Sequence, residues 1–485
     1  MAKRSRKNRK KQTSLGVVNL ALLLLYTLVS VLVVFTMYSY QFLNFSQVNN
    51  IYTGALALIF IVSLLFVLLR KAPRLTAILL SVSTFLGVVT LFFFKSAIDV
   101  TGKLNETASF SEVEMSVVVP KDSNISDISQ VADVQAPLGR DRTNIEKVIN
   151  QVQAEKNHTL QVQDVESYSV AYDNLLAGSS QAMVLNSAYA SLLEADYDSK
   201  LKTIYTYNIK KEVTTAAQTK EITDADVFNV YISGIDTYGP ISSVSRSDVN
   251  IIMTVNQKTK KVLLTTTPRD SYVQIPDGGN NQYDKLTHAG LYGVEASMKT
   301  LENLYGINLD YYARINFTSF LTLIDQVGGI EVYNDQEFTS WTNSKYTFPV
   351  GNVTLNSEQA LAFVRERYSL ANGDNDRGKN QEKVIAAVIG KLASINSISN
   401  FSAIINGLSG SIQTDMPLST MMTLANGQLE SGANYEVISQ ALTGTGSTGQ
   451  LPSYAMPNAS LYMMSIDENS LATVKQAITD VMEGR

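Results

Sequence analysis

The sequence predicts a membrane-anchored α/β protein. We expect three N-terminal transmembrane helices, a small α/β accessory domain and a larger α/β domain with a central mixed sheet. Two observations predict this class. The first 95 residues hold three long apolar stretches and no acidic residue, and the remainder alternates between strand-like and helix-like patterns. At 485 residues, the chain is long enough for an anchor and two domains.

Three apolar segments form the predicted anchor, between residues 15 and 95. A basic tail at 1–14 precedes them, and no charged residue occurs from Gln12 to Leu69. The polar stretch NFSQVNN divides the first span, at about 15–40, from the second, at about 51–69, and a third at about 75–94 follows the basic loop RKAPR. Each is near the ~20 residues that cross a ~30 Å hydrocarbon core, and the first is too long for a removable signal peptide.

The position of the cations predicts the topology of the anchor. The tail and the RKAPR loop are basic, whereas the loop between the first two spans carries no charge. Basic segments stay in the cytoplasm, so we expect a multi-pass cell-membrane protein whose large C-terminal region, after Lys95, is extracellular. The basic tail itself fits a flank that meets anionic lipid.

Composition excludes several function classes. The chain has no cysteine and only two histidines, His158 and His288. Disulfides and a thiol nucleophile are therefore excluded, and a Ser-His-Asp triad or a histidine zinc site is disfavoured. Eleven of the 39 basic residues and none of the 44 acidic ones precede Ser96, so the rest of the chain is strongly acidic and does not suit nucleic acid binding. We expect His288 to be a buried or capping residue rather than a base.

The outer region divides into three parts. A linker is expected at 96–110, and the accessory domain at 111–215 has strand-like pieces (MSVVVP, KLKTIYTYNI) and a helical piece (NIEKVINQVQAEKN) but no chemical motif. The catalytic domain is expected at 222–485. Its strands VFNVYISGI, DVNIIMTV and KVLLTTT are followed by helices and strands in alternation, among them a helix that begins at an Asn356 or Ser357 cap.

Charged residues gather where these strands and helices end. They are Asp236, Arg246, Asp248 and Arg269 after or before strands, and Arg365, Arg367, Arg377 and Gln381 in the stretch AFVRERYSLANGDNDRGKNQ. Loops beyond strand ends are the usual ligand sites of α/β sheets. Arginine binds phosphate in bidentate fashion, and one or two aspartates can hold Mg²⁺ with phosphate oxygens. Spacing alone leaves open that the arginines only pair with Glu366, Asp374 or Asp376.

We also expect the helix that begins near Asn356 to end before Arg365. Two arginines that are two residues apart project to the same side of an extended chain but diverge on a helix.

As a whole, the chain resembles the LytR-CpsA-Psr family, and within it the capsule-locus CpsA branch. The resemblance covers about Val227 to Ser394 and rests on ordered motifs: GID and SRSDVNIIMTVNQKTKKVLLTTTPRD, KLTHAG, NLYGINLDYYARINFTSFLTLIDQVGGIEV, FPVGNVTLNSEQALAFVRER and GDNDRGKNQEKVI. The preceding module and the three crossings also fit this branch. One departure is Asn380, at a place where many relatives carry a further arginine.

The resemblance implies a phosphotransferase at the outer face of the membrane. It would transfer a glycan, a capsular polysaccharide or similar anionic polymer, from a polyprenyl-pyrophosphate carrier to peptidoglycan, with pyrophosphatase as a side activity. The residues implied to bind pyrophosphate are Arg246, Arg269, Arg365, Arg367, Arg377 and Gln381. Asp236 and Asp248 would hold Mg²⁺, with Asp248 and Arg269 catalytic; the lipid-pocket residues stay unassigned. The alternative function is a non-catalytic membrane regulator of capsule synthesis that binds isoprenoid phosphate.

Overall fold

The computed structural model describes residues 2–190, 192–193, 196–213, 227–235, 241–393, 412–431 and 435–485. The chain divides into two compact units. The first comprises Met1–Gly102 and Pro417–Ala433, and the second comprises Lys103–Met416 and Asn434–Arg485.

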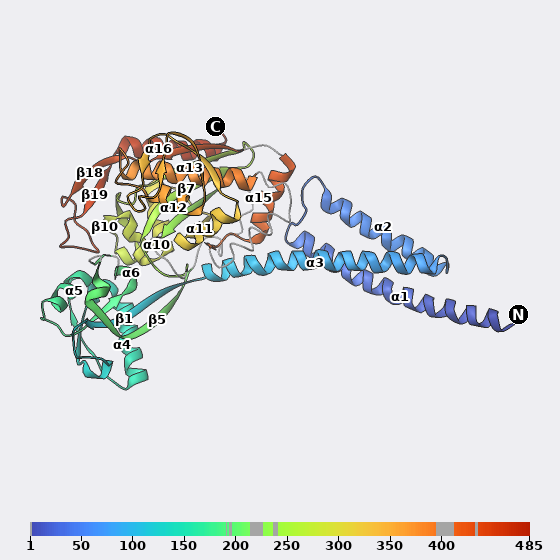
Figure 1. The fold of residues 1–485 in the computed structure, drawn as a ribbon, viewed down its shortest axis with the longest axis horizontal. Helices are drawn as coiled ribbons and strands as arrows, with labels where there is room; N and C mark the ends of the chain where they lie inside the picture. Colours follow the sequence, from blue (N-terminus) through green and yellow to red (C-terminus); the bar gives the residue numbers. More distant parts are fainter. Residues whose placement is uncertain are drawn as a thin grey trace. The chain divides into compact units, whose positions relative to one another are not determined.

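The first unit is helical and contains the three expected apolar helices (Figure 1). Its helices are α1 (Ala2–Ser39), α2 (Val48–Leu68), most of α3 (Pro73–Ala108) and α15 (Leu418–Ser431). The segments that are long and apolar enough to cross a membrane are Leu15–Ser39, Val48–Leu68 and Pro73–Ala108. Most of the segment that was expected to be a linker is helical, because α3 continues as one helix to Ala108. An i,i+4 ion pair between Lys95 and Asp99 supports this part of the helix.

The accessory domain is a five-stranded mixed sheet with helices. Its strands lie in the order β3-β2-β4-β1-β5. They are β1 (Phe110–Pro120), β2 (Asp133–Ala136), β3 (Gln161–Asp164), β4 (Met183–Asn186) and β5 (Leu201–Glu212), with α4 (Leu138–Lys156), α5 (Tyr168–Leu176), α6 (Ser187–Ala190) and α7 (Tyr197–Lys200). The apolar patterns MSVVVP and KLKTIYTYNI become the long antiparallel pair β1 and β5, as expected.

The core of the accessory domain includes residues of the larger α/β domain. Val244, Leu291 and Ala455 are each less than a tenth exposed and belong to the same hydrophobic cluster as Met115 and Val184 of the accessory sheet. The two domains therefore share a core.

A six-stranded mixed sheet is the centre of the larger α/β domain that was expected to be catalytic, as predicted. Its strand order is β16-β11-β6-β7-β8-β17. The strands are β6 (Val227–Ile235), β7 (Ser247–Asn256), β8 (Lys261–Thr266), β11 (Tyr311–Ile315), β16 (Ile412–Thr414) and β17 (Glu436–Ala441). β7 pairs antiparallel with both β6 and β8, while β6–β11 and β8–β17 are parallel pairs. Because β7 and β8 are antiparallel neighbours, the start of β7 lies beside the end of β8.

Helices cover both faces of this sheet. Leu263 of β8 packs in one hydrophobic cluster with α10 (Val294–Tyr305) and α16 (Glu468–Glu483), whereas Thr266, which points to the opposite face, lies against Gly378 of α13 (Asp374–Ala393). A third cluster joins α13 to α11 (Phe317–Gln326) and α12 (Ser357–Arg365). The remaining elements are β9 (Tyr272–Ile275), β10 (Gln282–Lys285), α9 (Leu286–Ala289), β12 (Ile330–Asn334), β13 (Phe338–Thr339), β14 (Thr347–Phe348), β15 (Gly351–Leu355), β18 (Gly444–Thr448) and β19 (Tyr462–Ile466), with the short 3-10 turns Ile128–Gln130, Asp277–Gly279 and Gly290–Tyr292.

Candidate active site

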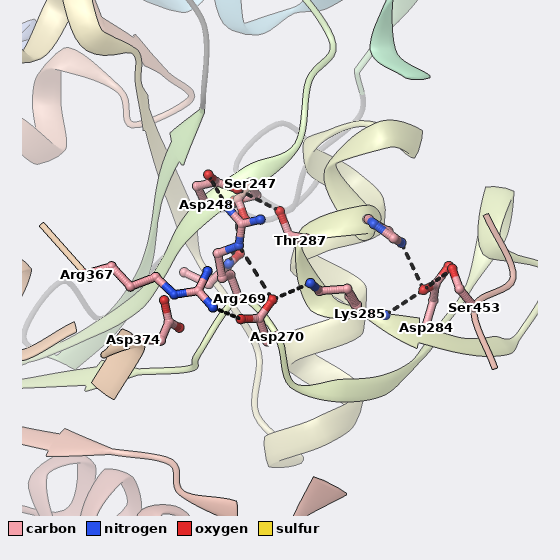
Figure 2. Close-up of polar contacts among 12 residues, drawn as sticks. Ser247, Asp248, Arg269, Asp270, Asp284, Lys285, Thr287, Arg367, Asp374 and Ser453 are labelled. Atoms are coloured by element: carbon pink, nitrogen blue, oxygen red, sulfur yellow. Dashed lines mark hydrogen bonds and ion pairs between the residues drawn. The ribbon is translucent and has the colours of Figure 1, made fainter. Parts of the chain in front are cut away.

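Asp248 and Arg269 meet at one edge of the central sheet. Asp248 is the second residue of β7 and Arg269 lies in the loop after β8, so the antiparallel pairing brings the two together. Arg269 donates from Nη1 to Asp248 Oδ2, and the Thr287 hydroxyl donates to Asp248 Oδ1 at 2.9 Å. Figure 2 shows Asp248 held between these two donors. The carboxylate thus has a fixed orientation.

A second carboxylate, Asp270, is surrounded by cations. Only 2% of its side chain is exposed. Its Oδ1 lies 2.5 Å from Lys285 Nζ and 3.7 Å from Arg269 Nε, and its Oδ2 lies 3.9 Å from Arg367 Nη2 (Figure 2). Arg269 therefore lies between two carboxylates, and Arg367 reaches the site from the far side of Asp270. Burial of this charge is tolerable because three cations compensate it.

Arg367 and Arg377 come from the stretch after β15. Helix α12 begins with the expected cap: Gln359 donates its backbone N–H to Asn356 Oδ1, and Asn356 donates its N–H to Gln359 Oε1. The prediction that this helix ends before Arg365 is wrong, because Arg365 is its last residue. The backbone of Glu366 is extended (φ −63°, ψ 136°), so the chain turns away from the helix before Arg367. The two arginines are therefore not presented from one extended strand.

The turn GDND is also more helical than expected. Gly373 has a φ of 53°, a conformation that glycine adopts without strain, and α13 begins directly after it at Asp374. In the first turn, Arg377 Nη2 pairs with Asp374 Oδ1, and both side chains are nearly buried, at 11% and 13% exposed. Asp374 lies beside Asp270 and Arg367 in Figure 2.

The electrostatics show that these groups form one cluster. Burial raises the pKa of Asp248, but the guanidinium groups of Arg269, Arg246 and Arg377 outweigh burial and bring this pKa below its ordinary value. Burial raises the pKa of Asp374; Arg377 opposes this effect, the Asp270 carboxylate adds to it, and the pKa lies above its ordinary value. Asp248 is therefore ionised at neutral pH, in a field produced by three arginines.

Of the predicted residues, Asp248, Arg246, Arg269, Arg367 and Arg377 thus act on one another. Arg365 instead stacks over the Phe317 ring at the start of α11, 4.2 Å from its centroid. Gln381 donates from Nε2 to the Val364 carbonyl at 3.3 Å. Asp236 lies outside the described residues. Asn380, where the resemblance leads one to expect an arginine, is 4% exposed and therefore buried.

Sequence reasoning gave no site role to Asp270, Lys285 and Thr287, and it named Asp374 only as a possible ion-pair partner of the arginines. Signals for them exist. Asp270 adjoins Arg269 in the TPRD motif, and Lys285 and Thr287 both belong to the KLTHAG motif. A buried cluster of cations requires carboxylates of its own, and Asp270 and Asp374 lie one and three residues from Arg269 and Arg377.

The donor set suits a hard metal ion. No group of three metal-ligating side chains occurs among the described residues, which do not include Asp236. Mg²⁺ does not require such a group, since it usually takes one or two carboxylates and completes its shell with water and phosphate oxygens. The lowered pKa of Asp248 keeps one such carboxylate charged beside the arginines.

His288 is a structural residue, as expected. It is 2% exposed, and its Nδ1 lies 2.9 Å from Asp284 Oδ1. Ser453 Oγ and the Ala455 backbone N–H both donate to the same carboxylate at 2.8 Å (Figure 2). The serine binds the aspartate and not the histidine, so these three side chains are not arranged as a Ser-His-Asp triad. They tie residues 453–455 to the start of α9.

Comparison with known proteins adds the following similarities. The family model described as the LytR_cpsA_psr family matches residues 194–478, which is more than half of the chain. TagU of Enterococcus faecalis, a polyisoprenyl-teichoic acid–peptidoglycan teichoic acid transferase, is 35% identical over 53% of this chain and 80% of its own length. TagT of Bacillus subtilis, a transferase of the same description, is 32% identical over 52% of this chain and 76% of its own. Among solved structures, TagV of B. subtilis matches with a TM-score of 0.46 and 26% identity, over 54% of this chain and 99% of TagV.

A second family model, that of a DNA polymerase processivity factor, matches residues 70–185. This range starts just before α3 and ends inside β4, so it combines a candidate membrane span with part of the accessory sheet. It covers well under half of the chain and supports no assignment.

Proposed function

Because the chain belongs to the LytR_cpsA_psr family, we propose that it transfers an anionic glycopolymer, such as a capsular polysaccharide, from a polyprenyl-pyrophosphate carrier to a hydroxyl of peptidoglycan. The single observation that carries this proposal is the cluster of Arg246, Arg269, Arg367 and Arg377 around nearly buried carboxylates. The relatives named as teichoic acid transferases support the class of donor and acceptor.

The guanidinium groups suit the charge of a diphosphate. In the structure, Asp248, Asp270 and Asp374 neutralise them. Asp374, whose raised pKa indicates an unfavourable place for a carboxylate, occupies a position that a phosphate oxygen would fill with less repulsion. Arginine remains charged at every physiological pH and can form two parallel bonds to a phosphate. The site can therefore bind pyrophosphate without a titrating group.

The transfer itself needs one proton acceptor. The acceptor hydroxyl oxygen forms a bond to the phosphorus that carries the glycan. The bond from this phosphorus to the bridging oxygen breaks, and the lipid monophosphate leaves. Asp248, which is ionised and held by Arg269 and Thr287, can take the hydroxyl proton. Mg²⁺ held by Asp248 and Asp236 would supply further charge stabilisation for the phosphate oxygens. The arginines stabilise the negative charge that develops on the oxygens.

The lipid tail requires an apolar surface near the phosphate site. Helix α11 offers one, since Phe320 and Leu323 are only partly buried and Phe317 lies under the Arg365 guanidinium. Helix α10 is less suitable, because its apolar residues Val294, Met298 and Leu301 are buried in the core. We therefore place the tail along α11.

The membrane orientation is part of the proposal. Three apolar helices with basic flanks at the tail and at Arg70–Arg74 support an orientation with the N-terminus inside and all residues after α3 outside. The acceptor, peptidoglycan, is on that side.

A transfer assay with the full-length protein in nanodiscs tests the function. A polyprenyl-pyrophosphate-linked oligosaccharide and purified peptidoglycan should give covalently modified peptidoglycan and lipid monophosphate in the presence of Mg²⁺. Asp248→Ala should abolish product formation while binding of the lipid persists. Lipid binding without any turnover, in the wild type and with all acceptors, would instead indicate a membrane regulator that senses isoprenoid phosphate. Release of lipid monophosphate without peptidoglycan would indicate hydrolysis as a side activity.

A further inference from the structure

Two large aromatic side chains are exposed together on the catalytic domain. Trp341 is 73% exposed and Tyr368 is 72% exposed. Their ring centroids are 5.9 Å apart, with an interplanar angle of 55°. Trp341 is the only tryptophan of the chain. Single exposed aromatics are ordinary, but an adjacent pair is an apolar surface that water covers at a cost.

This pair adjoins the arginine cluster directly. Tyr368 follows Arg367, and the Arg367 guanidinium carbon lies 5.7 Å from the centre of the Tyr368 ring. The same guanidinium reaches Asp270, with Nη2 3.9 Å from Oδ2. Arg367 therefore has the predicted phosphate site on one side and the aromatic pair on the other.

A buried carboxylate, Glu366, holds the pair in place. It is 1% exposed and accepts backbone N–H groups from Trp341 at 2.5 Å and from Arg367 and Ser369 at 2.9 Å. The Trp341 loop joins β13 to β14, and the Tyr368 segment follows α12. Glu366 thus fixes two segments, far apart in sequence, that each present one ring. Burial raises the pKa of Glu366, but these hydrogen bonds outweigh burial and lower it below its ordinary value. The Glu366 carboxylate therefore stays charged at neutral pH.

We propose that Trp341 and Tyr368 form a stacking surface for the sugar that is attached directly to the pyrophosphate of the lipid-linked donor. This inference rests on the proposed function. The π faces of tyrosine and tryptophan carry partial negative charge and attract the polarised C–H groups on the face of a pyranose ring. If Arg367 binds the phosphate, the sugar bonded to this phosphate would lie next to the Tyr368 ring, because the Arg367 guanidinium is adjacent to that ring.

The donor sugar fits this place better than the acceptor does. The sugar stays on the attacked phosphorus throughout the transfer, so it remains next to the arginines that hold this phosphate. The acceptor hydroxyl is expected at Asp248, which Arg269 binds through Nη1, whereas Arg269 Nε faces Asp270, the carboxylate that Arg367 reaches. The acceptor and the aromatic pair are thus on different sides of Arg269.

Intrinsic fluorescence can test this because Trp341 is the sole tryptophan. The full-length protein in detergent micelles, which contain no other tryptophan, is titrated with a short-chain polyprenyl pyrophosphate that carries one N-acetylhexosamine, with the same lipid lacking the sugar, and with a soluble muropeptide. The sugar-bearing lipid should give a saturable change of emission, and the sugar-free lipid and the muropeptide should not. A saturable change with the muropeptide alone would overturn the proposal and assign the surface to the acceptor.

Variants separate stacking from general damage. Tyr368→Ala should weaken binding of the sugar-bearing lipid about tenfold and leave the sugar-free lipid unaffected, whereas Tyr368→Phe should retain binding. Tyr333→Ala is the matched control, since Tyr333 is 58% exposed on β12 and is not part of the pair. Equal binding of both lipids by wild type and Tyr368→Ala contradicts this inference alone. Failure of the wild type to bind either lipid contradicts the proposed function, and this inference with it.

Discussion

At the scale of single residues, Arg269 is the residue on which the site depends most. It contacts both Asp248 and Asp270, and it contributes to the low pKa of the former. Arg367 reaches Asp270, and Arg377 pairs with Asp374. In the proposed mechanism, the Arg269 guanidinium would orient Asp248 as the proton acceptor and bind a phosphate oxygen at the same time.

Removal of this guanidinium should affect transfer strongly. We expect Arg269→Ala to lower kcat/KM by about 10²–10³-fold, a magnitude typical for the loss of one preorganised donor to a developing oxyanion. Arg269→Lys should recover only part of this loss, because an ammonium cannot form the bidentate contact. Arg142→Ala is the control, since Arg142 forms only an exposed i,i+4 pair with Glu146 on α4. Initial rates of peptidoglycan modification measure all three. Wild-type kinetics for Arg269→Ala would contradict the assigned role.

Asp376 should make stability depend on pH. Its carboxylate accepts from Gln336 at 2.9 Å, from the Asn372 backbone at 3.0 Å and from Lys379 at 3.2 Å. Burial opposes these bonds, yet the pKa of Asp376 falls to about 2. A pKa below the unfolded value stabilises the fold above about pH 4, and this contribution disappears as the pH falls toward the folded pKa.

Asp376→Asn should therefore reduce the free energy of unfolding by about 1–2 kcal/mol at pH 7, after allowance for solvent screening. The difference from wild type should shrink as the pH falls from 5 toward 2. Thermal unfolding at a series of pH values measures this. A difference that stays constant with pH would mean that geometry, and not charge, accounts for the role of Asp376.

At the scale of elements, the ends of helices decide where the arginines point. Strands β6 to β8 and the cap of α12 could be predicted, because alternation and the Asn356–Gln359 spacing are local signals. The end of α12 could not be predicted locally. It depends on Glu366, whose carboxylate binds backbone groups of residues 341, 367 and 369. Such a long-range contact leaves no periodic pattern in the sequence.

The first turn of α13 shows a second limit. The letters GDND resemble a turn, yet Asp374 and Asp376 begin a helix. Acidic residues in a first turn interact favourably with the helix dipole, so the same letters fit both states. In the candidate site, the arginines were predictable by residue type and Asp374 was a possible partner for them, whereas the part of Asp270 in the cluster became clear only from its burial among cations.

The cap of α12 can be tested without touching the site. Asn356→Ala should lower stability by about 1 kcal/mol, because it leaves the Gln359 backbone N–H without its acceptor. Asn356→Ser or Asn356→Asp should retain most of the stability, because both can cap. Thermal unfolding measures the shift. Transfer activity at 20 °C should remain near wild type, and a large loss of activity in a folded Asn356→Ala protein would show that α12 positions Arg365 for function.

At the scale of the whole molecule, the predicted topology has a direct test. The chain lacks cysteine, so one introduced cysteine is the only reactive thiol. In intact cells, a membrane-impermeant maleimide should label Ser46→Cys, between the first two spans, and Tyr283→Cys, which is 51% exposed in the catalytic domain. Lys71→Cys should react only after the cells are opened. Labelling of Lys71→Cys in intact cells would contradict the proposed orientation, because it would show that residue 71 is outside the cell.

The core that the two outer domains share determines how this protein can be divided. Val244, Leu291 and Ala455 lose their apolar surroundings if residues 111–213 are removed. A catalytic fragment cut free of the module would expose these side chains and aggregate, and both domains should melt in a single calorimetric transition. Grafting the module onto another transferase would likewise require those three partners. The module and the domain that shares its core are therefore expected to fold as one unit.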